Sequence, residues 1–129
     1  MKKIIMATFI FVCLLALTSC ASSSDEILHL GVNAVITEID GPNKTIIVRD
    51  ADEQGVLGEK CLVDCSEIPL IYCRYDTHQV QDISFDDLQV NDDVILSIRE
   101  SEIESYKNEN GQRGSIKIEQ LQLGTQRIQ

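Results

Sequence analysis

Short runs in which hydrophobic and polar residues alternate follow one another along the chain after residue 29. Alternation with a period of two places one face of an extended strand in a core and leaves the other in solvent. The sequence therefore predicts five main strands, over residues 30–39, 45–50, 59–66, 94–99 and 115–123. The alternation changes register within the first and last of these runs, which predicts a bulge or bend in each.

The segments between the runs contain residues that favour turns. Residues 40–44 (Asp-Gly-Pro-Asn-Lys) predict a turn that joins the first two strands in a hairpin, because Gly and Pro supply the backbone angles of a reversal. Residues 51–58 predict an acidic loop in solvent. Ser84 and Asp87 form a capping-box-like pair, which predicts one short helical turn with Phe85 and Leu88 facing the core. Residues 100–114 are polar and predict a loop.

Five strands with a short helical turn between the third and fourth are typical of an OB-like barrel. The predicted fold class is therefore all-β, a small five-stranded Greek-key barrel formed by residues 30–129. An open sandwich is the alternative. Closure of the sheet would remove the free strand edges that invite unwanted pairing.

The first 19 residues have a different pattern. Lys2 and Lys3 precede an apolar run over residues 4–17 that is interrupted only by Thr8. A basic head, an apolar body and small residues before a cleavage site are the parts of a secretory signal peptide. The run is shorter than the roughly 20 residues that a membrane-spanning helix needs, so a signal peptide over residues 1–19 is favoured.

The end of this segment, Leu17-Thr18-Ser19-Cys20, resembles the lipobox of bacterial lipoproteins. The resemblance implies cleavage before Cys20 and a diacylglyceryl thioether, such as one with palmitate chains, on its sulfur. Two or three acyl chains make a stable membrane anchor, and residues 20–29 would be a flexible tether. The expected location is the extracytoplasmic face of the cell membrane, or the outer membrane in a cell that has two. An ordinary cleavable signal is the alternative.

The net charge of the chain narrows the classes of partner. The whole chain carries a charge of −10, and removal of Lys2 and Lys3 with the signal brings the mature chain to −12. Nucleic-acid binding calls for a basic patch, so a nucleic-acid partner is not expected. A surface of this charge would also keep the domain away from anionic lipid headgroups, which leaves the anchoring to the lipid on Cys20.

Three cysteines remain once the signal peptide and the lipidated Cys20 are set aside. Cys61 and Cys65 in one strand would lie about 13 Å apart at ~3.3 Å per residue, too far for a disulfide. The sequence therefore predicts a Cys65–Cys73 or a Cys61–Cys73 bridge with one thiol left over. The alternatives are three buried thiols that act as small hydrophobes, or a redox or soft-metal site. The cysteine spacings lack a nearby His, so no metal site is predicted.

Motifs of catalysis are missing from the sequence. It contains no G-x-S-x-G, H-E-x-x-H, phosphate-binding loop or C-x-x-C, so neither an enzyme nor a cofactor is predicted. The first hypothesis is a non-catalytic binding module of the cell envelope, with Tyr72, Arg74, Tyr75 and Tyr106 as its contact residues. The few aromatic residues favour a protein or another envelope component over stacked bases or sugars. The other hypotheses are a thiol-based redox or metal-binding protein and a purely structural spacer.

A resemblance to a known group of proteins is carried by two segments. Residues 83–94 (Ile-Ser-Phe-Asp-Asp-Leu-Gln-Val-Asn-Asp-Asp-Val) are similar to a signature of small barrel domains in secreted and lipid-anchored proteins of Gram-positive bacteria. Residues 103–106, with Lys117 and Ile118, look like the ending of an uncharacterised lipoprotein family in that group. The chain departs from the pattern at Asn91, where Gly is usual, and at Lys107, where Pro is usual. The resemblance implies an OB-like barrel at the cell envelope and no particular activity.

Overall fold

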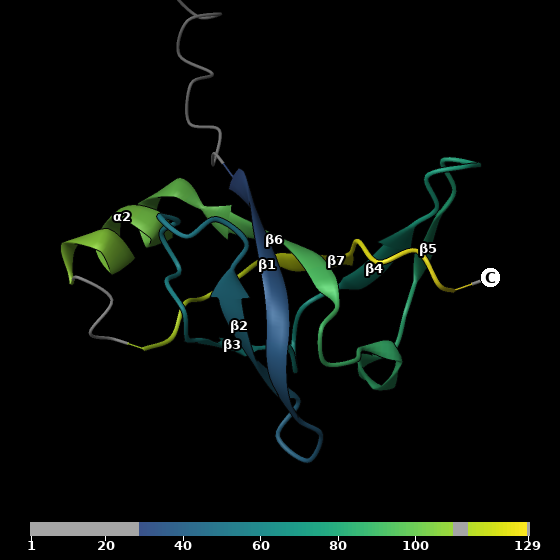
Figure 1. The fold of residues 1–129 in the computed structure, drawn as a ribbon, viewed down its shortest axis with the longest axis horizontal. Coiled ribbons are helices and arrows are strands. Elements are labelled where there is room, and N and C mark those ends of the chain that lie inside the picture. Colours follow the sequence, from purple (N-terminus) through teal and green to yellow (C-terminus); the bar gives the residue numbers. More distant parts are fainter. Residues whose placement is uncertain (1–28, 110–113, 129) are drawn as a thin grey trace, which may run out of the picture.

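The computed structural model of the protein describes residues 29–109 and 114–128. Seven strands of this part form one sheet, in the order β3-β2-β1-β6-β7-β4-β5 (Figure 1). The strands are β1 (His29–Asp40), β2 (Thr45–Asp50), β3 (Cys61–Asp64), β4 (Leu70–Cys73), β5 (Val80–Asp82), β6 (Asp93–Arg99) and β7 (Gln120–Leu123). A 3-10 helix, η1 (Phe85–Asp87), and an α-helix, α2 (Glu100–Asn108), complete the described elements.

Strand β1 organises the sheet because it is long enough to pair differently along its two halves. Its first half, residues 29–35, pairs with β6, and its second half, residues 34–40, pairs with β2. The register with β2 shifts between Ile36 and Glu38, which confirms the bulge predicted in this strand. The predicted hairpin is also confirmed, and its turn includes Lys44 with a positive φ of 53°.

The predicted alternation is visible in the burial of the strands. Ile46 and Val48 of β2, and Cys61 and Val63 of β3, are buried while their neighbours are more exposed. Buried apolar side chains from the long strands meet in one core, which also contains residues from the helices and loops. Its largest fully buried members are Ile36, Ile46, Leu57, Leu96, Ile98, Leu121 and Leu123.

The sheet is not closed into a barrel, so the predicted five-stranded OB-like barrel is wrong in both strand number and closure. At one end, β3 meets the chain before β7 only at an isolated parallel bridge between Leu62 and Ser115. At the other end, all three residues of β5 are exposed. A strand without a buried face has no apolar surface that would hold it against the far edge of the sheet, and the sheet stays open.

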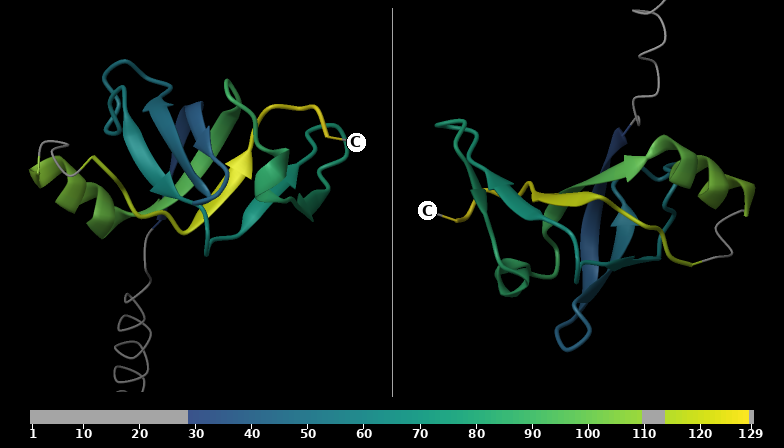
Figure 2. Two further views of the ribbon diagram at one scale, coloured as in Figure 1. Left: turned by 90° about the horizontal axis from the view of Figure 1, so that it is seen from below. Right: turned by 180° about the vertical axis from the view of Figure 1, so that it is seen from behind.

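Strands β4 and β5 form a hairpin that the sequence did not predict. The polar residues between them make a tight turn, in which the N–H of His78 donates to the carbonyl of Arg74 at 2.8 Å and His78 has a φ of 58°. Strand β4 also pairs with β7 in parallel, which attaches the hairpin to the main sheet. The hairpin lies at the opposite end of the molecule from α2 (Figures 1 and 2).

The short helical turn predicted after residue 83 is confirmed as η1. The N–H of Asp86 donates to Ser84 Oγ, and the N–H of Ser84 donates to Asp87 Oδ2 at 2.9 Å, so the capping box is complete. Phe85 and Leu88 are both buried, as expected. Asn91 has a φ of 77°, a conformation that Asn adopts more readily than most residues.

The segment predicted as a loop over residues 100–114 begins instead with helix α2. Acidic residues in its first turn and Lys107 in its last turn complement the helix dipole. Ile103 and Tyr106 lie three positions apart, on one face of the helix, and both are buried. Tyr106, which the sequence predicts as a surface contact residue, is only 3% exposed, so its ring contributes to the core.

The signal peptide over residues 1–19, the lipidated Cys20 and most of the tether over residues 20–29 lie outside the described residues. They remain predictions from the sequence. The helices that the structure does describe are all too short or too polar to cross a membrane.

Candidate functional site

The β4–β5 hairpin and the chain after β7 enclose a cleft of about 390 Å³, here called the hairpin cleft. Three of the four contact residues predicted from the sequence meet in it, and no sequence pattern predicts that they lie close to the C-terminal end. The cleft is lined by Tyr72, Arg74, Tyr75, Asp76, Gln126, Arg127 and Ile128. Figure 2 shows this end of the chain beside the hairpin.

Gln126 holds the hairpin cleft together. Its Nε2 donates to the carbonyl of Cys73 at 3.0 Å, while its Oε1 accepts the N–H of Tyr75 at 3.0 Å. The same Oε1 accepts the O–H of Tyr72 at 3.4 Å. One amide thus fixes the backbone at the start of the turn and one wall of the cleft. Sequence reasoning missed Gln126, because a lone polar residue near a chain end carries no pattern.

The predicted residues play different parts in the cleft. Tyr72 is buried and forms part of its wall, whereas 55% of Tyr75 is exposed. The guanidinium of Arg74 lies 3.2 Å from the carboxylate of Asp76 in an exposed ion pair. Such pairs contribute only about 0–1 kcal/mol, so a ligand could exchange for Asp76 at little cost. The hairpin cleft therefore offers an aromatic ring, an exchangeable cation and fixed main-chain groups.

Tyr75 also lines a second cavity, of about 410 Å³. This cavity is bounded by residues of β1 and β6, including Asn33 and Ile95, and by Gly124 after β7. Tyr75 therefore contributes to the lining of both cavities. A partner that covered Tyr75 could reach both of them, which makes this residue the centre of the candidate surface.

Arg127 lines the hairpin cleft, but its guanidinium is engaged elsewhere. One of its nitrogens is paired with the buried carboxylate of Asp92, and another donates to the carbonyl of Asp87. The side chain thereby ties the chain end to η1 and to the turn before β6. Its role is to fix the cleft rather than to contact a ligand.

Tyr106 lies apart from the other three predicted contact residues. Its O–H donates to the carbonyl of Leu57 at 3.3 Å, and the ring belongs to the core. The structure therefore separates Tyr106 from the candidate surface.

The remaining cysteines are free thiols in the structure, two of them buried and Cys73 half-buried. Burial, with the charge of Asp64 adding to it, raises the pKa of the Cys65 thiol to about 12. Burial also raises the pKa of Cys61, although a hydrogen bond with Tyr106 acts in the opposite direction. The bridge predicted between Cys73 and Cys65 or Cys61 is not formed here and stays a prediction for the oxidised protein.

No cluster of three or more His, Cys, Asp or Glu side chains suited to a metal ion occurs within residues 29–109 and 114–128. Comparison of the chain with protein-family models, with curated proteins and with solved structures finds no match.

Proposed function

We propose that the protein is a lipid-anchored, extracytoplasmic binding module that contacts another component of the cell envelope through the hairpin cleft. One observation carries the binding part of this proposal. Tyr72, Arg74 and Tyr75, which the sequence predicts as contact residues, line one cleft together with Gln126, whose side chain holds the backbone at Cys73 and Tyr75.

The residue types of the cleft support recognition rather than catalysis. Tyrosine and arginine are enriched among the residues that dominate binding energy at protein interfaces. Gln126 orders the backbone at Tyr75 before any partner arrives, which lowers the entropy lost on binding. The exposed ring of Tyr75 would supply apolar contact area, and Arg74 would pair with a carboxylate or another acidic group of the partner.

The thiol-based alternative receives less support. A reactive cysteine needs a lowered pKa and access to solvent, because the thiolate is the nucleophile and the metal ligand. Cys61 and Cys65 are buried, and the pKa of each is raised. A redox or metal-binding role would have to rest on Cys73 alone.

The anchor is tested in a bacterial host with the full chain and a clickable palmitate analogue. We expect the label to be incorporated into the wild-type chain, which should fractionate with membranes. Cys20→Ala should lose the label, while Cys13→Ala, a matched change within the signal peptide, should keep it. Labelling of the Cys20→Ala variant would contradict the lipoprotein assignment.

The cleft is tested by placing a photo-crosslinking amino acid at position 75 of the full chain in living cells. The control places the same amino acid at position 30, where the native leucine is similarly exposed but belongs to the start of β1. We expect a discrete adduct from position 75 that is absent from position 30 and is weakened by Arg74→Glu. Identical adducts from both positions, or none from position 75, would contradict the proposed use of the cleft.

A further inference from the structure

Strand β3 ends the sheet on the side opposite β5, and its outer edge is covered for only part of its length. The N–H of Leu62 donates to the carbonyl of Gly114 at 2.9 Å, and the N–H of Ile116 donates to the carbonyl of Leu62 at 3.1 Å. These two bonds form the isolated parallel bridge at Ser115. They provide hydrogen-bond partners for the main-chain N–H and C=O of Leu62, but not for those of the next residue that faces the outer edge.

That residue is Asp64. Within an antiparallel pair, main-chain groups point alternately toward the partner strand and away from it. The N–H of Cys65 donates to the carbonyl of Lys44, just before β2, at 2.9 Å. The main-chain N–H and C=O of Leu62 point away from β2, and those of Asp64, two residues later, therefore do so too. Within residues 29–109 and 114–128, neither its N–H nor its C=O has a hydrogen-bond partner.

The chain that covers Leu62 turns away before it reaches Asp64. The N–H of Lys117 donates to Glu102 Oε1 in α2 at 3.2 Å, which draws this segment toward the helix. Ile116 and Ile118 meanwhile bury their side chains in the core. The divergence leaves a groove of about 400 Å³ between β3 and residues 115–118, here called the edge groove. This volume falls within the range of about 300–1,000 Å³ found for ligand pockets.

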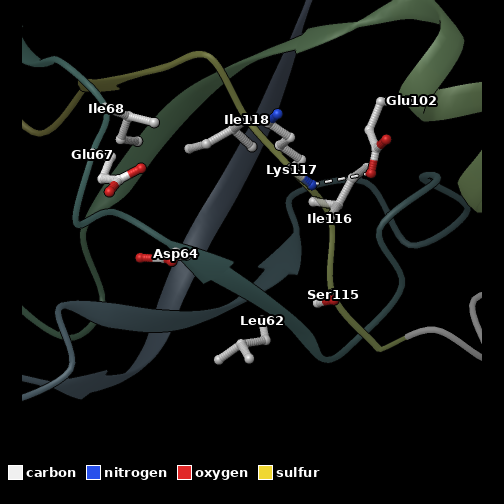
Figure 3. Close-up of a pocket in the computed structure, with 9 residues that line it drawn as sticks. All are labelled: Leu62, Asp64, Glu67, Ile68, Glu102, Ser115, Ile116, Lys117 and Ile118. Carbon is white, nitrogen blue, oxygen red and sulfur yellow. Dashed lines mark hydrogen bonds between the residues drawn. The ribbon is translucent and has the colours of Figure 1, made fainter.

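Figure 3 shows the side chains of the edge groove. Leu62 and Ile68 supply most of its exposed apolar surface, because Ile116 and Ile118, which also line it, are almost fully buried. Asp64 and Glu67 lie on one side of the groove, and Glu102 lies across from them beside Lys117. Hydrogen bonds from Ser66 lower the pKa of the Asp64 carboxyl, so it is ionised at neutral pH. The two exposed acidic groups Asp64 and Glu67 thus flank an apolar surface, while the carboxylate of Glu102 is engaged by the main chain of Lys117.

We propose that the edge groove binds an extended peptide segment rich in lysine or arginine by adding it as a strand to β3. The outward N–H and C=O of Asp64 would pair with the peptide main chain, as in other cases of strand addition. Asp64 and Leu62 project from the same face of β3, so the basic peptide side chains would lie on that face beside Asp64. The apolar side chains between them would point to the opposite face, where Ile116 and Ile118 are buried. The acidic side chains fix the sign of the partner's charge and its register.

The negative charge of the protein favours a basic peptide over a second copy of the chain as the occupant of the edge groove. A second copy would place the acidic edge of β3 against another acidic chain, because the protein as a whole carries a charge of −10. Like charges that face each other across an interface are unfavourable. A basic peptide removes this repulsion and gains attraction from the same groups. The edge groove is also distinct from the hairpin cleft, so the two proposals can fail separately.

The test uses the full chain in uncharged detergent micelles and a fluorescent heptapeptide of alternating valine and lysine, followed by anisotropy. We expect saturable binding of this peptide and none of the matched valine–glutamate peptide. A version with methylated main-chain nitrogens cannot donate to β3 and should bind about tenfold more weakly. Equal binding of the methylated and unmethylated peptides, or of the basic and acidic peptides, would overturn the proposal.

Variants locate the binding on the protein. The double change Asp64→Asn and Glu67→Gln should weaken binding about tenfold. A matched double change, Glu53→Gln with Asp82→Asn, removes the same charge from exposed sites elsewhere and should have no effect. Arg74→Glu in the hairpin cleft should also leave peptide affinity unchanged. If the two double variants lose affinity equally, the attraction is general and strand addition at β3 is wrong.

Discussion

The carboxylate of Asp50, at the end of β2, accepts the main-chain N–H of Leu57 through Oδ2 at 3.1 Å. Its other oxygen accepts the N–H of Asp52 at 2.9 Å. Asp50 and Leu57 are both buried, so one carboxylate closes the loop over residues 51–58 from within. The position of Leu57 in turn brings its carbonyl to the hydroxyl of Tyr106 in α2.

Gly55→Ala tests this closure. A Cβ atom at position 55 would lie 1.9 Å from Cγ of Asp50, so the carboxylate would have to move and release the N–H of Leu57. Loss of the partner of a buried polar group costs about 1–3 kcal/mol. We therefore expect the free energy of unfolding to fall by about this amount in urea denaturation followed by circular dichroism.

Gly41→Ala is the matched control for this prediction. A Cβ atom at position 41 meets nothing within 4 Å, so the free energy of unfolding should change by no more than about 0.5 kcal/mol. Equal effects of the two substitutions would show that Asp50 does not organise the loop.

Local patterns were sufficient to predict several parts of the fold. The alternation of residues 30–50 predicted β1, β2 and the bulge, because each depends on neighbours in sequence. Ser84 and Asp87 predicted η1 for the same reason, since both halves of a capping box lie within four residues. Tyr72, Arg74 and Tyr75 line one cleft partly because they belong to one short segment, and their role as contact residues stays a prediction.

The parts that were missed depend on contacts between distant segments. Strand β5 is exposed along its whole length and contains one apolar residue, Val80, so its pairing with β4 holds it rather than a burial pattern of its own. Helix α2 contains only two buried residues, Ile103 and Tyr106, too few for its periodicity to stand out in a polar run. Gln126 reaches the hairpin from more than fifty residues away, a contact that a single sequence does not reveal.

Arg127→Met should destabilise the protein, although the residue is close to the chain end. The substitution leaves the carboxylate of Asp92 buried without its guanidinium partner. Removal of one member of a fully buried pair costs about 3–5 kcal/mol, and the partial exposure of Arg127 reduces the expected loss to about 2 kcal/mol. Thermal and urea denaturation of the wild-type and variant proteins provide the measurement.

Arg99→Met is the control for Arg127→Met. Arg99 forms a 2.8 Å pair with Glu119, but both side chains are substantially exposed. Exposed pairs contribute about 0–1 kcal/mol, so this variant should unfold at nearly the wild-type urea concentration. A larger loss from Arg99→Met than from Arg127→Met would contradict the assigned roles.

Tyr106→Phe tests whether Tyr106 stabilises the core or belongs to the binding surface. The change removes the hydroxyl that donates to the carbonyl of Leu57, and it should lower the free energy of unfolding by about 0.5–1.5 kcal/mol. Tyr75→Phe should leave stability unchanged, because the Tyr75 ring is largely exposed. If crosslinking from position 75 were lost in the Tyr106→Phe variant while the protein remained folded, Tyr106 would belong to the binding surface after all.

The three cysteines should differ in their rate of alkylation in the native protein. Cys73 is half-buried and should react first with iodoacetamide. Cys61 and Cys65 are buried with raised pKa values, so they should react only as fast as the protein opens. Mass spectrometry of peptides after timed labelling gives the order. Rapid labelling of Cys61 or Cys65 would favour the thiol-based function instead.

The raised pKa of Cys65 also predicts how stability depends on pH. The thiol titrates near 9.0 in the unfolded chain and at about 12 in the folded protein, so the folded state holds its proton more tightly. The contribution of the protonated Cys65 thiol to the free energy of unfolding is fully present below about pH 9. It decreases between pH 9 and 12, by up to about 1.4 kcal/mol per pH unit. Other groups titrate in this range, so the informative quantity is the difference between wild-type and Cys65→Ala slopes in urea denaturation under reducing conditions. The variant should lose stability less steeply with rising pH. Parallel slopes would mean that Cys65 ionises as readily in the folded protein as in the unfolded chain, and that its burial is not maintained in solution.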